Sequence, residues 1–349
     1  MIAIKAHYTH VVKSLIRMFE AGQLSNVITI YVEPDYGFVA QVKYRNLSVR
    51  YIHGASVDVN ANGASFIATD KAHAKRFMTA LGYRTPIGKA FVVPRRMDEL
   101  KSYYESYGIE ETSTFSTIPD YVTNTIGFPC FIKPNNGYRG VDVYQCWDLS
   151  DVNAVLTTMS ERCYDLIIVE AAASMPEYRV VIFEGRFIAC YSKRPLSITG
   201  DGTSTIEQLL LVLVDEMARI GRKVDLEQLK PQIQHRLSKN NLDLATVLGS
   251  EMPFQLVDMA NLSTGGSTED FTHLLHPQWQ ALCIQLSRDM NLGLVGIDFM
   301  CADITRPEAD YTIIEINAAP ALNNYASLGA LQAQRVEALY LEIFNTPTS

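Results

Sequence analysis

The pattern of apolar and polar positions alternates between strand-like and helix-like stretches along the whole chain. The first 64 residues predict a short helix and then a β-meander, since three β-rich segments are separated by turn residues. From Thr69, cationic and apolar positions follow a helical pattern that we expect to end at Gly82. Strand-like and helical runs then alternate along the chain, which favours an α/β or α+β fold.

The central and C-terminal parts of the chain carry most of the predicted strands. Glu184 and Gly185 predict a hairpin between two of them. Residues 203–248 are predicted to be mainly helical, beginning with a capping box at Ser204 and Glu207. The expected strands are KAFVVP, FPCFIKP, VDVYQCW, DLIIVEAA, YRVVIFEG, RFIACYSKR, LVGIDFM and YTIIEIN, and the helices between them include MDELKSYYESYG and LSDVNAVLTTMSERC.

The composition excludes several classes of protein. With 349 residues, 48% hydrophobic and 19% charged, the chain can bury a large core in two or three subdomains. A net charge of -8 disfavours a general nucleic-acid or membrane-surface binder. The six cysteines lie far apart without a CxxC pair, so we interpret them as reduced packing residues. With neither a signal-like N-terminus nor a long apolar window, we expect a cytoplasmic protein.

A lysine at the end of a strand-like run, followed by two glycines, is the strongest local signal. The segment FIKPNNGYRGVDV carries Lys133, Gly137 and Gly140. Glycines let a backbone approach a phosphate closely, and a lysine supplies a point charge for it. Because the lysine precedes the glycines, the segment matches neither a Walker A motif nor a Rossmann fingerprint. The pattern alone is compatible with a phosphate-binding loop and with a structural loop.

Three polar residues interrupt the last two strand-like runs. They are Asp298, Glu315 and Asn317, and the last two share one face because side chains alternate along a strand. A buried carboxylate needs a cation or a basic partner. Oxygen-only ligands of this kind suit magnesium better than zinc. We favour a magnesium site over a structural ion pair, because Lys133 predicts a phosphate close by.

Two weaker patterns suggest contacts to a nucleotide and to an anion. Glu170 ends one apolar strand and Glu177 begins the next, so the crossover can offer backbone groups to a purine and a carboxylate to a ribose. The loop NLSTGG, residues 261–266, presents backbone and hydroxyl donors that suit an anion. A solvated strand end and a plain surface turn have similar sequences, so neither pattern decides alone.

Taken in order, these segments resemble the ATP-grasp superfamily, and more closely its cyanophycin synthetase-like branch. The resemblance runs from about residue 67 to residue 345, and GDGTSTIEQLL with a later NLSTGG is particularly typical of that branch. The other matching stretches are ATDKAHAKRFMTALGYRTPIGKAF, FPCFIKPNNGYRG, PEYRVVIF, LLHP, LVGIDFMCADITRP and IIEINAAP.

The resemblance implies an α+β fold of the ATP-grasp type, with two α+β lobes gripping ATP. We expect an N-terminal helix and β-meander over residues 1–64, packed beside the cleft or mediating a homodimer. The ATP-grasp region is expected over residues 65–345. Its parts are an N-terminal lobe (67–128), an ATP-binding subdomain (129–195), a mainly helical insertion (196–260) and a C-terminal catalytic lobe (261–345).

The resemblance also implies roles for individual residues. The nucleotide-binding set is Lys71, Lys133, Gly137, Gly140, Glu170, Ala173 and Glu177, with the lysines and glycines at the phosphates, Glu170 and the backbone near Ala173 at the adenine, and Glu177 at the ribose. The magnesium ligands are Asp298, Glu315 and Asn317. Arg194 matches an arginine that supports the transferring phosphoryl group, and Arg179 lies at the family's Tyr-Arg pair. The substrate-binding residues are Asn261, Ser263, Gly265 and Gly266.

The implied reaction is the ATP-dependent joining of a carboxylate to an amine through an acyl-phosphate, as in acid–amino-acid ligases. The expected cofactors are ATP and magnesium, as two ions with manganese as the alternative metal. The expected substrates are amino acids or peptides, with neither nucleic acid nor a membrane as partner. We expect a standalone ligase, because the separate domains of full cyanophycin synthetases have no match here. The alternatives are an ATP-grasp kinase and a catalytically silent ATP-binding regulatory protein.

Three positions depart from the family's pattern. Asp142 stands where related loops carry a third glycine, Met175 occupies a hinge position usually held by glycine, and Ala321 replaces a common glycine. We expect Asp142 to stiffen the loop or to repel phosphate. None of the three removes a ligand that the chemistry needs, so we expect an active enzyme.

Overall fold

The computed structural model describes residues 4–94, 114–137, 140–219, 224–258, 260 and 265–348. The predicted helix MDELKSYYESYG lies outside these ranges. Each of the strand-like runs predicted from the sequence forms a strand, so those predictions are confirmed. None of the helices in the part of the chain described here is long and apolar enough to cross a membrane.

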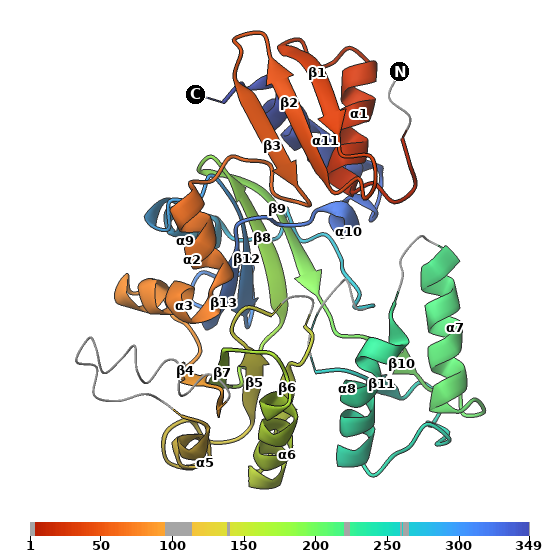
Figure 1. The fold of residues 1–349 in the computed structure, drawn as a ribbon. Coiled ribbons are helices and arrows are strands. Elements are labelled where there is room, and N and C mark those ends of the chain that lie inside the picture. The colour runs from red at the N-terminus through yellow and green to blue at the C-terminus, as the bar shows by residue number, and fades with distance from the viewer. Residues whose placement is uncertain are drawn as a thin grey trace.

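The two ends of the chain form one layer, which we call the terminal module. Helix α1 (His10–Glu20) packs on an antiparallel sheet of β1 (Val27–Val32), β2 (Val39–Tyr44) and β3 (Val49–His53). The last helix, α11 (Ala330–Asn345), lies against α1 and the same sheet (Figure 1). Apolar side chains from both ends share one buried cluster. The predicted meander is therefore present, and it packs on the C-terminal helix.

A buried arginine ties this module together. Arg50 is 4% exposed, and its Nε donates to the Tyr44 hydroxyl at 3.0 Å. Its Nη1 donates to the carbonyl oxygens of Val57 at 2.7 Å and Asp58 at 2.9 Å. Its Nη2 donates to the Thr346 carbonyl at 2.9 Å, beyond the end of α11. One guanidinium thus joins the meander to the last residues of the chain.

We expect Arg50→Met to lower the free energy of unfolding by about 3 kcal/mol, because it leaves buried carbonyl oxygens without donors. Urea unfolding followed by circular dichroism would measure the loss. The matched control is Arg45→Met, since Arg45 is exposed and donates to the Ser25 carbonyl at 2.9 Å. We expect this control to change stability by about 0.5 kcal/mol or less. Equal losses in the two variants would contradict a special role for Arg50.

Two four-stranded antiparallel sheets form the centre of the molecule and lie in separate layers (Figure 1). The first, in the order β4-β7-β5-β6, consists of β4 (Gly88–Val92), β7 (Leu166–Ala171), β5 (Cys130–Pro134) and β6 (Tyr144–Cys146). The second, in the order β13-β12-β8-β9, consists of β13 (Tyr311–Asn317), β12 (Leu294–Cys301), β8 (Glu177–Phe183) and β9 (Arg186–Lys193).

Helices accompany both sheets, which gives the predicted α+β architecture. The helices of the first sheet are η2 (Phe115–Thr117), α5 (Ile118–Tyr121), η3 (Val122–Ile126) and α6 (Leu149–Ser160). Those near the second sheet are α2 (Asn62–Thr69), α3 (Lys71–Ala80), α9 (Pro277–Asp289) and the short α10 (Asn323–Ala326). Each sheet buries its own apolar cluster, and the cleft between the sheets carries the polar residues described below.

A third body, which we call the helical insertion, follows β9. It consists of β10 (Ser197–Thr199), α7 (Ile206–Arg219), α8 (Leu226–Lys239) and β11 (Pro253–Gln255). Strands β10 and β11 pair antiparallel and close the insertion at its base. Its apolar side chains, from Leu196 to Val257, form a cluster of their own.

Two predicted helices begin slightly later than expected. The helix predicted from Thr69 to Gly82 is α3, which starts at Lys71 because Asp70 is extended and its carboxylate caps the helix by accepting the His73 N–H at 2.9 Å. The separate helix α2, which ends at Thr69, was not predicted. The capping box of α7 lies one residue later than expected. Thr205 N–H donates to Gln208 Oε1 at 2.9 Å, and Gln208 N–H donates to Thr205 Oγ1 at 3.2 Å. Ser204 instead donates its hydroxyl to Asp201.

Candidate active site

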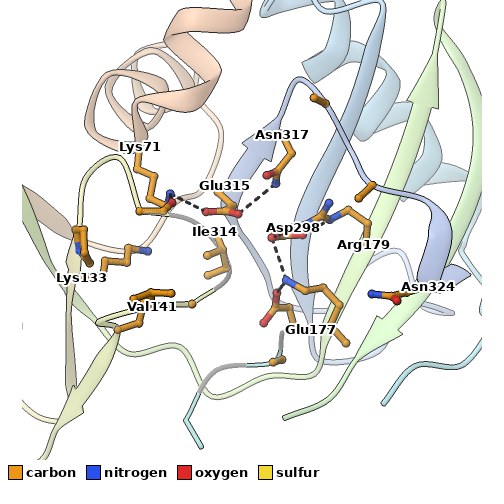
Figure 2. Close-up of a pocket in the computed structure, with 18 of the residues that line it drawn as sticks. Lys71, Lys133, Val141, Glu177, Arg179, Asp298, Ile314, Glu315, Asn317 and Asn324 are labelled. Carbon is orange, nitrogen blue, oxygen red and sulfur yellow. Dashed lines mark hydrogen bonds and ion pairs between the residues drawn. The ribbon is translucent and has the colours of Figure 1, made fainter. Parts of the chain in front are cut away.

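Polar residues from both central sheets surround one cavity of about 270 Å³. Four cationic and three acidic side chains line it, so opposite charges meet in a small volume. Figure 2 shows Lys71, Lys133 and Val141 on one side of Glu315, with Arg179 and Asn324 on the other. The lining residues used below are Lys71, Lys133, Gly137, Gly140, Val141, Val143, Glu177, Arg179, Tyr191, Lys193, Asp298, Glu315, Asn317, Ala321 and Asn324.

Two lysines and the two loop glycines predicted from the sequence occupy one end of this cavity. Lys71 is the first residue of α3, and its Nζ donates to the Gly137 carbonyl at 2.8 Å. Lys133 comes from β5, where it is 4% exposed. Both lysines and both glycines of the glycine loop, between β5 and β6, thus line the same cavity. Cations next to glycine backbone are the arrangement that a polyphosphate needs.

Lys133 belongs to a buried ion triad. The Glu170 carboxylate accepts from Lys133 with one oxygen and from Lys75 with the other. Burial would raise the pKa of Glu170, but the two ammonium groups hold it below its ordinary value. Only Lys133 of the three reaches the cavity lining. Sequence reasoning missed Lys75, which is 8% exposed on α3; a lysine one helical turn after Lys71 was its only signal.

The predicted magnesium ligands meet on two paired strands. Asp298 of β12 lies directly opposite Glu315 of β13 in the antiparallel register, and Asn317 Nδ2 donates to Glu315 at 3.2 Å. Lys71 Nζ lies 3.5 Å from the Glu315 carboxylate. Burial alone would raise the pKa of Glu315, but the charges of Lys71, Lys193 and other cations lower it below its ordinary value. Glu315 is therefore ionised at neutral pH.

Asp298 is held by two cations. Arg179 of β8 grips its carboxylate with Nε and with Nη2, the latter at 3.1 Å. Lys193 Nζ lies 3.0 Å from the same carboxylate and also pairs with Glu177. Burial disfavours the charge of Lys193, but Asp298 and Glu177 raise its pKa above the ordinary value. The two cations, Arg179 and Lys193, thus balance the two carboxylates, Asp298 and Glu177.

The protein's oxygen donors fit magnesium only if a bound phosphate supplies further donors. Asp298, Glu315 and Asn317 offer carboxylate and amide oxygens, which are hard donors of the right kind. Within the described residues, there is no cluster of three or more His, Cys, Asp or Glu side chains placed to hold a metal. Magnesium usually keeps few protein ligands and takes the remainder from phosphate oxygens and water. The site thus suits a metal that arrives with a phosphate.

Lys193 was missed by sequence reasoning, which selected its neighbour Arg194. Successive side chains of a strand face opposite ways, and only Lys193 lines the cavity. Arg194 is mainly exposed and its Nη2 lies 2.7 Å from Glu269. The predicted hairpin could have pointed to Lys193, because pairing of β8 with β9 sets Lys193 opposite Glu177 and Tyr191 opposite Arg179.

Several other predicted site residues lie away from the cavity lining of the described chain. Glu170 is engaged in its triad, and Ala173 follows the end of β7. Gly265 has a φ of 98° and packs against the insertion, where a Cβ would come within 2.8 Å of Leu196. Gly266 follows it, next to the Arg194–Ser267 bridge. Asn261 and Ser263 lie outside the described residues.

The three departures from the family pattern fall at different places. Asp142 turns its carboxylate to the hydroxyls of Tyr164 at 2.6 Å and Tyr144 at 3.3 Å, and its φ is 53°. Asp142 therefore anchors the loop through these two hydrogen bonds. Ala321 lines the cavity, whereas Met175 is half-buried in the crossover between β7 and β8.

A tyrosine stack supports the end of the cavity that lies beside Arg179 and Asn324, away from Lys71 and Lys133. Tyr191 lines it and stacks on Tyr325 of α10, with ring centroids 5.0 Å apart. Asp270 accepts from the Tyr325 hydroxyl at 3.2 Å and pairs with Arg335 of α11 at 3.3 Å. Burial would raise the pKa of Asp270, but hydrogen bonds from Thr272, Gln332 and Tyr325 lower it to about 2. This network fixes α10, which carries Asn324 into the cavity.

Comparison with known proteins finds sequence similarity to cyanophycin synthetases. No family model matches the chain. It is 28% identical over 227 residues to a cyanophycin synthetase of Geminocystis herdmanii, covering 60% of the chain and 25% of that protein. It is 30% identical over 224 residues to the cyanophycin synthetase of a Synechocystis species, covering 61% of the chain and 25% of that protein. The chain thus spans about a quarter of these curated relatives.

A solved structure matches almost the whole chain. A bifunctional glutathione synthetase from Pasteurella multocida superposes with a TM-score of 0.55 at 18% identity, over 96% of this chain and 44% of that one. The structure thus has the α+β fold of the ATP-grasp type that the motifs predicted. Its sequence is similar to those of the cyanophycin synthetases.

Proposed function

We propose that this protein is an ATP-dependent carboxylate–amine ligase that forms an amide through an acyl-phosphate. One observation carries the proposal: Lys71, Lys133, Asp298 and Glu315 come from separate elements and converge on one cavity. Cations for a polyphosphate thus stand beside oxygen donors for magnesium. The relationship to cyanophycin synthetases supports amide formation as the outcome. Amino acids or peptides are the proposed substrates.

The nucleotide phosphates would lie against Lys71, Lys133 and the glycine loop. Asp298, Glu315 and Asn317 would hold magnesium, which supplies charge neutralisation at the β- and γ-phosphates. Binding of the anionic triphosphate would give Lys71 a new partner in place of Glu315, which lies 3.5 Å away. The Glu315 carboxylate would then be free to hold magnesium. We also propose that the site holds two magnesium ions and that manganese is the alternative metal.

The reacting carboxylate would enter from the tyrosine end of the cavity. Its oxygen attacks the γ-phosphorus, the bond to the β-phosphate oxygen breaks, and ADP leaves with the electron pair. Arg179 and Lys193 stand beside Asp298, where they can stabilise charge on the transferring group. Attack of the amine on the acyl-phosphate then expels inorganic phosphate and forms the amide. Positioning and electrostatics supply the catalysis.

The test is a screen of amino-acid and dipeptide pairs for stimulated release of ADP and phosphate, with mass spectrometry of the product. We expect at least one pair to raise ADP release well above the background and to give a product one water lighter than its two substrates. A phosphorylated product without an amide would instead identify a kinase. Tight ATP binding without turnover under any pair would identify a silent binding protein.

A further inference from the structure

A glutamine of the helical insertion reaches into the loop that faces the cavity. Gln232 lies on α8, and its Nε2 donates to the carbonyl oxygens of Gly140 at 2.9 Å and Val143 at 3.2 Å. Gly140 and Val143 both line the cavity. Val141 and Gln232 also line a second cavity, which lies between the loop and α8. The helical insertion, which lies outside the two central sheets, therefore contacts the glycine loop directly.

The first of these hydrogen bonds controls the direction of a backbone amide. In a trans peptide, the C=O of one residue and the N–H of the next point in opposite directions. Holding the Gly140 carbonyl toward α8 therefore turns the Val141 N–H away from α8. Val141 lines the cavity near Lys133, as Figure 2 shows. Gly140 has a φ of 69°, which suits glycine and lets the peptide adopt this orientation.

Helix α8 is fixed firmly enough to act as an anchor. Lys239 Nζ lies 3.0 Å from Asp148 and 2.6 Å from Asp151, at the start of α6. Arg236 pairs with Asp258 at 3.1 Å. Residues spaced by three, four or seven positions share a helix face, so Gln232, Arg236 and Lys239 point the same way. The neighbouring face carries Leu229, Ile233 and Leu237 into the apolar cluster of the insertion.

The loop is held from its other side by Asp142. Its carboxylate accepts the Tyr164 hydroxyl at 2.6 Å, and Tyr164 belongs to the segment between α6 and β7. Gln232 and Asp142 thus restrain the same four residues, 140–143, from two different bodies. A loop restrained at both sides has little conformational freedom left to lose when a ligand binds.

We propose that Gln232 is a positioning residue, which orients the Val141 N–H toward the nucleotide phosphates from outside the two central sheets. The inference rests on the proposed function, because it takes the cavity to be a nucleotide site. It gives the helical insertion a part in nucleotide binding. The insertion and the glycine loop would then hold the phosphates as one unit.

The test compares Gln232→Ala with Gln234→Ala, its matched control. Gln234 lies on the same helix and is exposed. The first measurement is binding of a non-hydrolysable ATP analogue with magnesium. We expect Gln232→Ala to weaken binding roughly three- to tenfold, the range for one hydrogen-bonded polar pair. The control is expected to bind like the wild type. Gln232→Glu, which keeps the shape but removes the donor, is expected to weaken binding at least as much.

The second measurement is hydrogen exchange across residues 140–146 in protein without nucleotide. We expect faster exchange in Gln232→Ala than in the control, and this result does not depend on what the cavity binds. Unchanged exchange and unchanged affinity in Gln232→Ala would overturn the inference, as would equal losses in both variants. Failure of the wild type to bind the analogue, with exchange still accelerated, would overturn the nucleotide role and the proposed function but keep the anchor.

Discussion

Replacing Lys133 with methionine is expected to reduce substrate-stimulated ADP release by at least about 10²-fold, since the variant loses a charge that faces the transferring phosphates. Methionine keeps most of the side-chain volume, and Glu170 retains its second partner, Lys75. The protein should therefore remain folded. Steady-state ADP release and thermal unfolding of the same sample would measure both effects.

Lys75→Met is the matched control for this variant. It also removes one partner of Glu170, but Lys75 does not line the cavity formed by the described residues. If Lys133 acts on the nucleotide, Lys75→Met should lose stability while retaining much more turnover than Lys133→Met. Similar losses of turnover in both variants would instead mean that the buried triad matters only for the structure of β5 and β7.

Replacing Glu315 with glutamine is expected to produce a loss of similar size, at least about 10²-fold in turnover, together with a higher magnesium requirement. The substitution preserves the shape but removes the negative charge that is proposed to bind the metal. It also removes the partner of Lys71 at 3.5 Å. A magnesium titration of ADP release would measure both the maximum rate and the concentration at half saturation.

Glu308→Gln serves as the control for charge removal in the same lobe. Glu308 is exposed in the connection between β12 and β13, where it pairs with Arg306. Exposed ion pairs contribute little to stability, so turnover and the magnesium requirement should match those of the wild type. Wild-type magnesium dependence in Glu315→Gln would rule out its proposed role as a ligand.

Much of the fold was predictable because strand patterns are local. Each apolar run that the sequence marked as a strand forms one, and the Glu184-Gly185 hairpin forms with both residues at positive φ. Beyond this hairpin and the N-terminal meander, sequence patterns did not predict which strands pair. The order β4-β7-β5-β6 and the packing of α11 on the meander depend on contacts between distant segments. Local propensity carries little information about such contacts.

The candidate site was predictable to the extent that its residues are polar positions in apolar strands. Lys133, Asp298, Glu315 and Asn317 are polar positions in apolar runs, and the structure gathers them around one cavity. Choosing Arg194 over Lys193 depended on resemblance, whereas strand alternation distinguishes the two. Lys75 and Gln232 were not predictable, because helical lysines and glutamines are usually solvated. Only tertiary contact shows that they bind Glu170 and the glycine loop.

The sharing of one core by the two ends of the chain has a consequence for synthesis. Ser25 N–H donates to the side chain of Asn345, across 320 positions of sequence, and α1 packs on α11. A ribosome releases β1, β2 and β3 long before it releases α11. Until α11 is made, the apolar face of the meander lacks the side chains that α11 packs against it. Exposed apolar strands promote aggregation. Production at low temperature or with added chaperones is therefore expected to raise the yield of soluble protein.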